Sequence, residues 1–75
     1  MSKRKIESLY ASLGDEIRKA RTKAGLTQAE LAKKVKLNRT TITNFELGRH
    51  RLSLRNIEAI ARALGLVLKL KLARK

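Results

Sequence analysis

Residues 27–48 have the sequence TQAELAKKVKLNRTTITNFELG, and this stretch decides the fold of the chain. Thr27 and Glu30 have the spacing of a capping box, in which each side chain accepts a hydrogen bond from the other residue's backbone N–H. A helix is therefore predicted to begin at Gln28. Its apolar face is formed by residues at helical spacing, Leu31, Ala32 and Val35.

A second short helix follows a tight turn. Asn38 is a preferred N-cap residue, so this helix is predicted to begin at Arg39. Ile42 and Phe45 are three residues apart and face the interior. The polar residues on the other side carry hydrogen-bonding groups suited to DNA base edges, and they are Arg39, Thr40, Thr43 and Asn44.

The two helices resemble the helix-turn-helix of Cro/CI-type phage repressors, also called the Xre family. The resemblance is carried by LTQxELA at residues 26–32 and by TIxxFExG at residues 41–48, and it extends over residues 12–65. It implies an all-α fold, a compact four-helix repressor-like domain with its motif at residues 28–47. Lys36 departs from the family, which usually has Gly at this turn. Because positive φ costs a non-Gly residue about 1 kcal/mol, a slightly different turn is expected.

The geometry of a helix-turn-helix predicts where DNA is contacted. The N-terminal end of the second helix meets base edges in the major groove, so Arg39, Thr40, Thr43 and Asn44 are the candidate base-reading residues. Arg39 can donate two hydrogen bonds to guanine and Asn44 can pair with adenine, while Thr43 alternatively packs or touches phosphate. Phosphate contacts are expected from helix N-termini and from basic groups on the same side. These candidates are Gln28, Lys36, Asn38, Arg49, His50, Arg51 and Arg55.

The charge of the chain predicts a polyanionic partner. Its 75 residues include 19 Lys and Arg but only 6 Asp and Glu, which gives a net charge of +13. Double-stranded DNA is the expected partner. An anionic membrane surface would favour aromatic anchors, and single-stranded RNA would favour aromatic stacking platforms. The chain offers only Tyr10 and Phe45, so both alternatives are disfavoured.

The sequence predicts neither an enzyme nor a metal or cofactor site. It has no Cys, a single His50, and no pair of carboxylates from which a nucleophile and base could be assembled. The N-terminus lacks an apolar signal region, and the longest apolar run, residues 64–68, is too short to span a bilayer. A cytoplasmic, nucleoid-associated bacterial protein is expected.

Two opposite charges on apolar helical stripes predict a partly buried ion pair. Arg21 lies within the stripe of the first helix, and Glu46 directly follows Phe45. Either charge alone would be expensive to desolvate, so the two are expected to pair unless both reach water. The repressor family has a similar pair, and the resemblance implies a structural role.

The chain is expected to divide into three parts. Residues 1–11 form a basic N-terminal arm or a helical lead-in, with a frayed end as the alternative. Residues 12–65 form the DNA-binding domain, in which a capping pattern at Ser12 begins the first helix and Gly25 closes it. Ser53 caps the fourth helix, which ends at Gly65.

Residues 66–73 are predicted to form a dimerisation strand. Leucines alternate here with other residues, at positions Leu66, Leu68, Leu70 and Leu72. This two-residue period predicts a β-strand, and a lone strand needs a partner for its backbone. Antiparallel pairing with a second chain across a dimer is expected, while pairing with residues 3–6 or a ragged helix are the alternatives. In this feature the chain resembles HipB-type antitoxins.

The sequence therefore predicts a transcriptional repressor that binds an inverted-repeat operator as a homodimer. The resemblance to HipB-type antitoxins implies a further partner, a HipA-like kinase toxin, and repression of the operon that encodes both. A prophage repressor or a restriction-modification controller protein is the alternative within the same class. A protein-bridging module that does not bind DNA is the alternative from another class.

Overall fold

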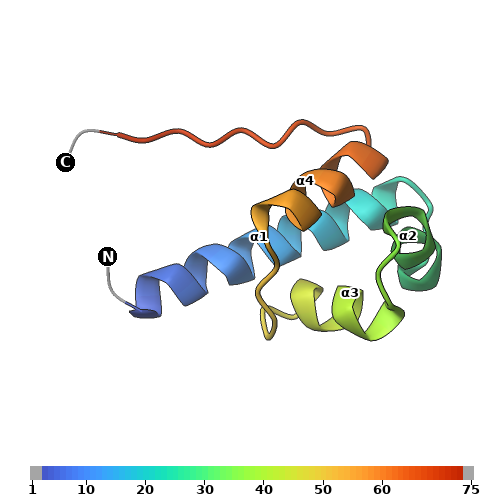
Figure 1. Cartoon of the computed structure of the whole chain (residues 1–75), viewed down its shortest axis with the longest axis horizontal. Helices are drawn as coiled ribbons and strands as arrows, with labels where there is room; N and C mark the ends of the chain where they lie inside the picture. Colours follow the sequence, from blue (N-terminus) through green and yellow to red (C-terminus); the bar gives the residue numbers. More distant parts are fainter. Residues whose placement is uncertain (1–2, 74–75) are drawn as a thin grey trace.

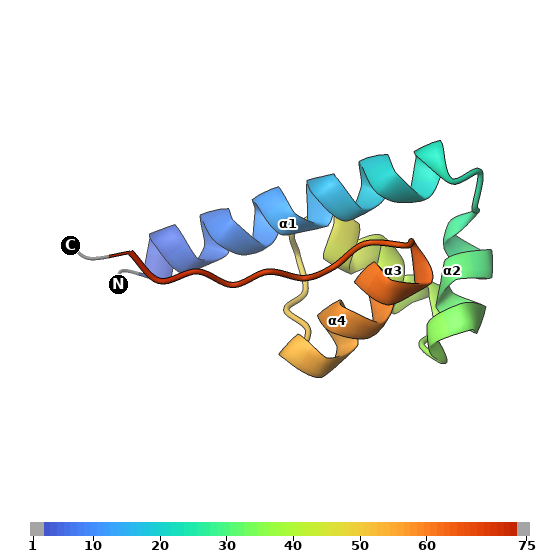
Figure 2. The same cartoon turned by 90° about the horizontal axis from the view of Figure 1, so that it is seen from above.

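A computed structural model describes residues 3–73, which form four helices. The helices are α1 (Lys3–Lys23), α2 (Gln28–Val35), α3 (Arg39–Glu46) and α4 (Leu54–Ala63). Figure 1 shows α1 running along the molecule, with the shorter helices gathered around its C-terminal half. Its N-terminal half extends beyond them (Figure 2). The predicted all-α, four-helix architecture is confirmed.

The hydrophobic core lies where α1 packs against α3, and where α2 packs against both α3 and α4. Its buried residues are Ile17, Leu31, Ala32, Ile42, Phe45, Leu52, Ile57, Ile60 and Ala61. Most of them lie at the helical spacing read from the sequence. Burial of these side chains is the main stabilising contribution, at roughly 25 cal/mol for each Å² of apolar surface.

Three helices begin at the N-caps predicted from the sequence. Thr27 and Glu30 form both hydrogen bonds of the capping box, at 2.8 and 3.0 Å. Asn38 Oδ1 accepts from the backbone N–H of Thr41 at 2.8 Å, and Ser53 caps α4 in the same way. Because an N-cap acts within three residues, it can be recognised without knowledge of the tertiary fold.

The four helices share one type of C-terminal end, in which the first or second residue after the helix adopts a left-handed conformation. Gly25, Gly48 and Gly65 fill this position after α1, α3 and α4, with φ between 73° and 76°. Lys36 fills it after α2 with φ 58°, and the next backbone N–H, at Leu37, donates to Ala32 O at 3.0 Å. The expectation of a different turn is therefore wrong, because Lys36 adopts the conformation that Gly would take.

The first helix begins earlier than predicted. Residues 3–11 belong to α1, so Ser12 lies inside the helix and is not its cap; Met1 and Ser2 of the predicted arm lie outside the described residues. Gly14, which seemed part of a capping pattern, is buried where α1 crosses α3. A Cβ at this position would overlap the carbonyl oxygen of Phe45. Gly14 therefore permits close helix packing.

The C-terminal segment contradicts the predicted strand, since residues 3–73 contain none. Residues 66–73 run back toward the N-terminal end of α1 without forming a helix (Figures 1 and 2). Pairing with residues 3–6 is also wrong, because those residues are helical. Leu68 packs against the core, and it helps to line a groove of about 320 Å³ between α1 and α4. Leu70 and Leu72 remain 69% and 100% exposed. A strand requires a backbone partner, and the subunit offers none.

The helices of residues 3–73 include none that is both long and apolar enough for a membrane span.

Candidate DNA-binding site

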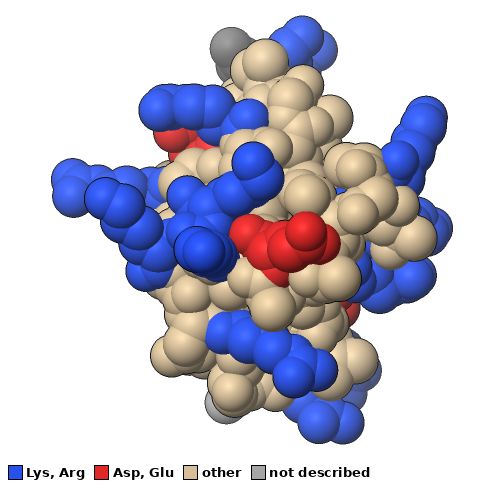
Figure 3. Space-filling model, turned by 90° about the vertical axis from the view of Figure 1, so that its right-hand side faces the viewer, with Lys and Arg blue, Asp and Glu red and all other residues tan. Residues whose placement is uncertain are grey.

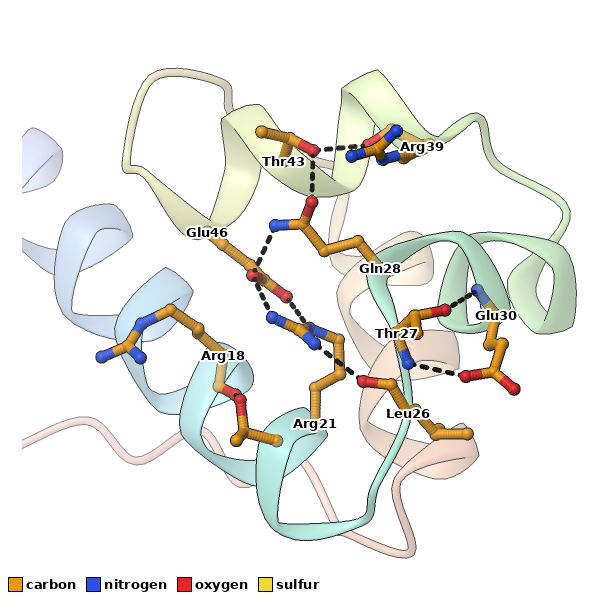
Figure 4. Close-up of polar contacts among 10 residues, drawn as sticks. Arg18, Arg21, Leu26, Thr27, Gln28, Glu30, Arg39, Thr43 and Glu46 are labelled. Atoms are coloured by element: carbon orange, nitrogen blue, oxygen red, sulfur yellow. Dashed lines mark hydrogen bonds and ion pairs between the residues drawn. The ribbon is translucent and has the colours of Figure 1, made fainter.

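An ion pair between Arg21 and Glu46 fixes the end of α3 against α1 (Figure 4). Arg21 Nε donates to Glu46 Oε2 at 2.7 Å, and Arg21 Nη2 donates to Glu46 Oε1 at 3.1 Å. The third guanidinium nitrogen, Nη1, donates to Leu26 O at 2.7 Å. The Glu46 side chain is 1% exposed and that of Arg21 14%. Because the planar guanidinium engages both carboxylate oxygens, the pair sets orientation as well as distance.

Gln28 extends this network from α2 to α3. Its Nε2 donates to Glu46 Oε1 at 3.1 Å, and its Oε1 accepts from Thr43 Oγ1 at 2.8 Å (Figure 4). The side chain for which a phosphate contact was predicted is thus engaged within the protein. Its backbone N–H lies in the first turn of α2, where a helix has no internal acceptor. A phosphate contact at position 28 can therefore use the main chain.

The four predicted base-reading residues differ in their surroundings. Arg39 and Thr40 are exposed at the N-terminal end of α3, and Asn44 is half-buried one helical turn further on. Thr43 is half-buried, and its hydroxyl lies 2.8 Å from Gln28 Oε1 and 3.0 Å from Arg39 O. Because that hydroxyl hydrogen is used within the protein, Thr43 can offer a base its methyl group or accept at its hydroxyl oxygen, but it has no hydrogen left to donate.

The predicted phosphate-binding residues are distributed around α3. Lys36 and Asn38 are exposed at the turn before it. Asn38 Oδ1 serves as the cap, so its side-chain NH₂ is the group that can donate. The loop that follows α3 carries exposed basic residues, and a further one lies in the first turn of α4. These residues are Arg49, His50, Arg51 and Arg55.

The surface around α2 is strongly basic. On this face, Lys and Arg side chains surround a smaller acidic patch (Figure 3). Lys33, Lys34 and Lys36 are exposed there, and so is Glu30. The backbone N–H of Thr27 donates to the Glu30 carboxylate and lowers its pKa below the ordinary value, so this group stays ionised as part of the cap. Such an excess of positive charge attracts a polyanion.

Sequence reasoning missed one contact that bears on this surface. The Arg51 guanidinium lies 5.5 Å from the centre of the Tyr10 ring, and Tyr10 Oη donates to Leu52 O at 3.4 Å. The sequence predicts a basic arm or a helical lead-in over residues 1–11, and neither places Tyr10 against Arg51 and Leu52. A signal was present, because Ile6, Tyr10 and Leu13 continue the apolar stripe of α1 at helical spacing.

A short helix that is held from behind, with polar and basic groups on its outer side and a second helix crossing its start, defines a helix-turn-helix DNA-binding domain. Residues 17–68 match the helix-turn-helix family HTH_3. Since this match covers more than half of the chain, the chain belongs to this family of DNA-binding transcription regulators.

Similar proteins agree with this assignment. The chain is 51% identical over 49 residues to an uncharacterised HTH-type transcriptional regulator of Methanothermobacter thermautotrophicus, covering 65% of this chain and 71% of that protein. The restriction-modification controller protein C.AhdI from Aeromonas hydrophila has a TM-score of 0.76 at 33% identity, covering 80% of this chain and 87% of that one. The clp gene regulator ClgR from Corynebacterium glutamicum has a TM-score of 0.77 at 29% identity, covering 79% and 63%. The chain thus spans less than two thirds of the ClgR chain.

Proposed function

We propose that this protein is a dimeric transcriptional repressor that recognises an inverted-repeat operator by placing α3 in the major groove. One observation carries the proposal. The network of Arg21, Gln28 and Glu46 holds α3 from behind, while Arg39 and Thr40 are exposed at its N-terminal end. This is the end with which the second helix of the motif reaches base edges.

Each outward side chain suits a different chemical contact. Arg39 donates to guanine O6 and N7, and Asn44 pairs with adenine N6 and N7. Thr40 offers a hydroxyl group, and Thr43 offers its methyl group to thymine. The phosphate contacts come from Lys36, from the NH₂ of Asn38 and from the basic groups of residues 49–55. Each phosphate that is neutralised adds about 0.9 to the slope of log affinity against log salt, so binding depends steeply on salt.

The C-terminal segment supports the dimer. Val67, Leu70 and Leu72 are exposed in the subunit. Residues 66–73 form no strand there, where they have no backbone partner, but a second copy of the segment would supply one. Antiparallel pairing about a residue on a two-fold axis places even-numbered residues opposite even-numbered residues. All the leucines of two such segments therefore share one face. Two copies related in this way would read half-sites about 34 Å apart.

A restriction-modification controller role is the second candidate, and the similarity to C.AhdI favours it. The genes beside this one distinguish the two candidates, since a controller is expected next to an endonuclease and a methyltransferase. The HipA-like toxin partner expected from the sequence depended on the C-terminal strand, which residues 3–73 lack. No observation favours that partner. A kinase-like gene beside this one would be evidence for it.

The proposal is tested by selecting bound sites from random duplex DNA and then measuring the affinity of variants. Arg39→Ala is expected to weaken binding to the selected site by roughly 1 to 3 kcal/mol and to relax the preference at one base pair. Lys23→Ala, on the exposed end of α1, removes the same charge and is the matched control. An equal loss for Arg39→Ala on the selected site and on random DNA would mean that Arg39 contacts only the backbone. Absence of binding to any duplex would favour a protein-bridging module.

A further inference from the structure

The N-terminal half of α1 lies against the loop that follows α3. Tyr10 Oη donates to the carbonyl of Leu52 at 3.4 Å, and the Arg51 guanidinium lies 5.5 Å from the centre of the Tyr10 ring. On the next residue of α1, Ala11 lies so close to Gly48 that an added Cβ there would be 3.0 Å from that of Ala11. Both ends of the loop are thus in contact with one turn of α1.

We propose that the turn of α1 at Tyr10 and Ala11 is a brace for loop 49–52, and that Tyr10 is a positioning residue that holds Arg51 ready for a DNA phosphate. The inference rests on the proposed function, because it requires the loop to face DNA. It gives this turn of α1 a role in DNA binding through the loop, where the sequence predicted only a basic arm or a helical lead-in.

The geometry leaves Arg51 able to bind while it is held. The guanidinium carbon lies within the roughly 6 Å range of a cation–π contact, and the exposed side chain keeps N–H groups that can donate to a phosphate. Leu52 is buried at 6% exposure and anchors the loop, and Tyr10 is half-buried and packs against the core. The ring is therefore fixed, while Arg51 itself is exposed.

The contact with Tyr10 lowers the conformational entropy that Arg51 loses when it binds DNA. A free Arg side chain loses rotamer entropy when it is immobilised. An Arg51 already confined by Tyr10 gives up part of that freedom before DNA arrives. Removal of the ring should therefore weaken DNA binding only through Arg51, which distinguishes positioning from a purely structural role in the core.

The test is a double-variant cycle on duplex DNA, using the full chain and fluorescence anisotropy at several salt concentrations. Arg51→Ala is expected to lower the salt slope by about 0.9 for each protomer bound. Tyr10→Leu keeps an apolar side chain but removes the ring face, and should weaken binding roughly three- to tenfold. In the Arg51→Ala background, the same change should have less than a twofold effect. Tyr10→Phe keeps the ring and should retain the salt slope, and Leu9→Ala, exposed on the same turn, is the control.

Several results would overturn the brace. An additive effect in the double variant, or an unchanged affinity for Tyr10→Leu, would mean that Tyr10 does not act through Arg51. An unchanged slope for Arg51→Ala would mean that Arg51 contacts no phosphate. In either case, the proposed function would stand if Arg39→Ala still weakens binding to the selected site. Should Tyr10→Leu fail to fold, NMR of the wild type decides. The Arg51 side-chain protons should keep their ring-current shift on DNA, and loss of that shift would refute the proposal.

Discussion

Lys36 adopts the left-handed backbone conformation at the turn between α2 and α3, with φ 58°. A residue with a Cβ is less stable there than Gly by about 1 kcal/mol. Lys36→Gly is therefore expected to raise the free energy of unfolding by about 0.5 to 1 kcal/mol, since the greater freedom of Gly in the unfolded chain offsets part of the gain. Urea denaturation followed by circular dichroism measures the change. Lys34→Gly, inside α2, is the control and should lower stability by about 1 kcal/mol. A loss in both variants would contradict this account of the turn.

Glu46 is the residue whose loss should be most costly among the acidic side chains of the described ion pairs. Glu46→Ala leaves the guanidinium of Arg21 without its carboxylate in a largely buried position, and it also removes an acceptor from Gln28. The expected loss of stability is about 3 kcal/mol or more. Glu58→Ala breaks the exposed pair with Arg62 and should cost less than about 1 kcal/mol. Thermal denaturation of the two variants compares them directly, and equal losses would argue against a structural role for the buried pair.

At the scale of the element, Gly14 determines how closely α1 approaches α3. Within a helix, replacement of Gly by Ala normally stabilises by about 1 kcal/mol. Gly14→Ala should do the opposite and destabilise by roughly 1 to 3 kcal/mol, because the new Cβ would overlap Phe45 O and force the two helices apart. Chemical denaturation gives the sign, and Ser12→Ala, exposed on the same helix, should cause little change. A stabilised Gly14→Ala variant would show that the crossing is loosely packed.

The elements that could be predicted from the sequence are those defined by local contacts. Thr27, Asn38 and Ser53 were recognised as caps because each acts on a backbone N–H three residues away. The start of α1 was misplaced because Ser12 and Gly14 resemble a helix start locally. Gly14 is instead required by the close approach of Phe45, which is distant in sequence. The alternation of residues 66–73 records spacing but cannot show whether a second segment is present to pair with. For the same reason, the inward bonds of Gln28 could not be read from its place in the motif.

At the scale of the whole molecule, the proposed dimer depends on the exposed leucines of residues 66–73. Leu70→Ser combined with Leu72→Ser should convert a dimer to a monomer, because both side chains are largely exposed in the subunit and contribute little to its own core. Sedimentation velocity reports the change. Lys69→Ser combined with Lys71→Ser alters the alternate positions of the same segment and should leave the dimer intact. A dimer that persists in the leucine variant would place the interface elsewhere.

The hydrogen-bond network behind α3 also has a consequence for protein engineering. Because Arg21, Gln28 and Glu46 hold the helix through its inner side, the side chains at positions 39, 40 and 44 contribute none of those bonds. Replacing the residues at these three positions should therefore cost the scaffold little, and under the proposed function it would retarget the domain to other operators. Position 43 does not share this freedom. A change there removes the hydroxyl that donates to Gln28 Oε1, so any altered specificity would be accompanied by a weaker attachment of α3 to α2.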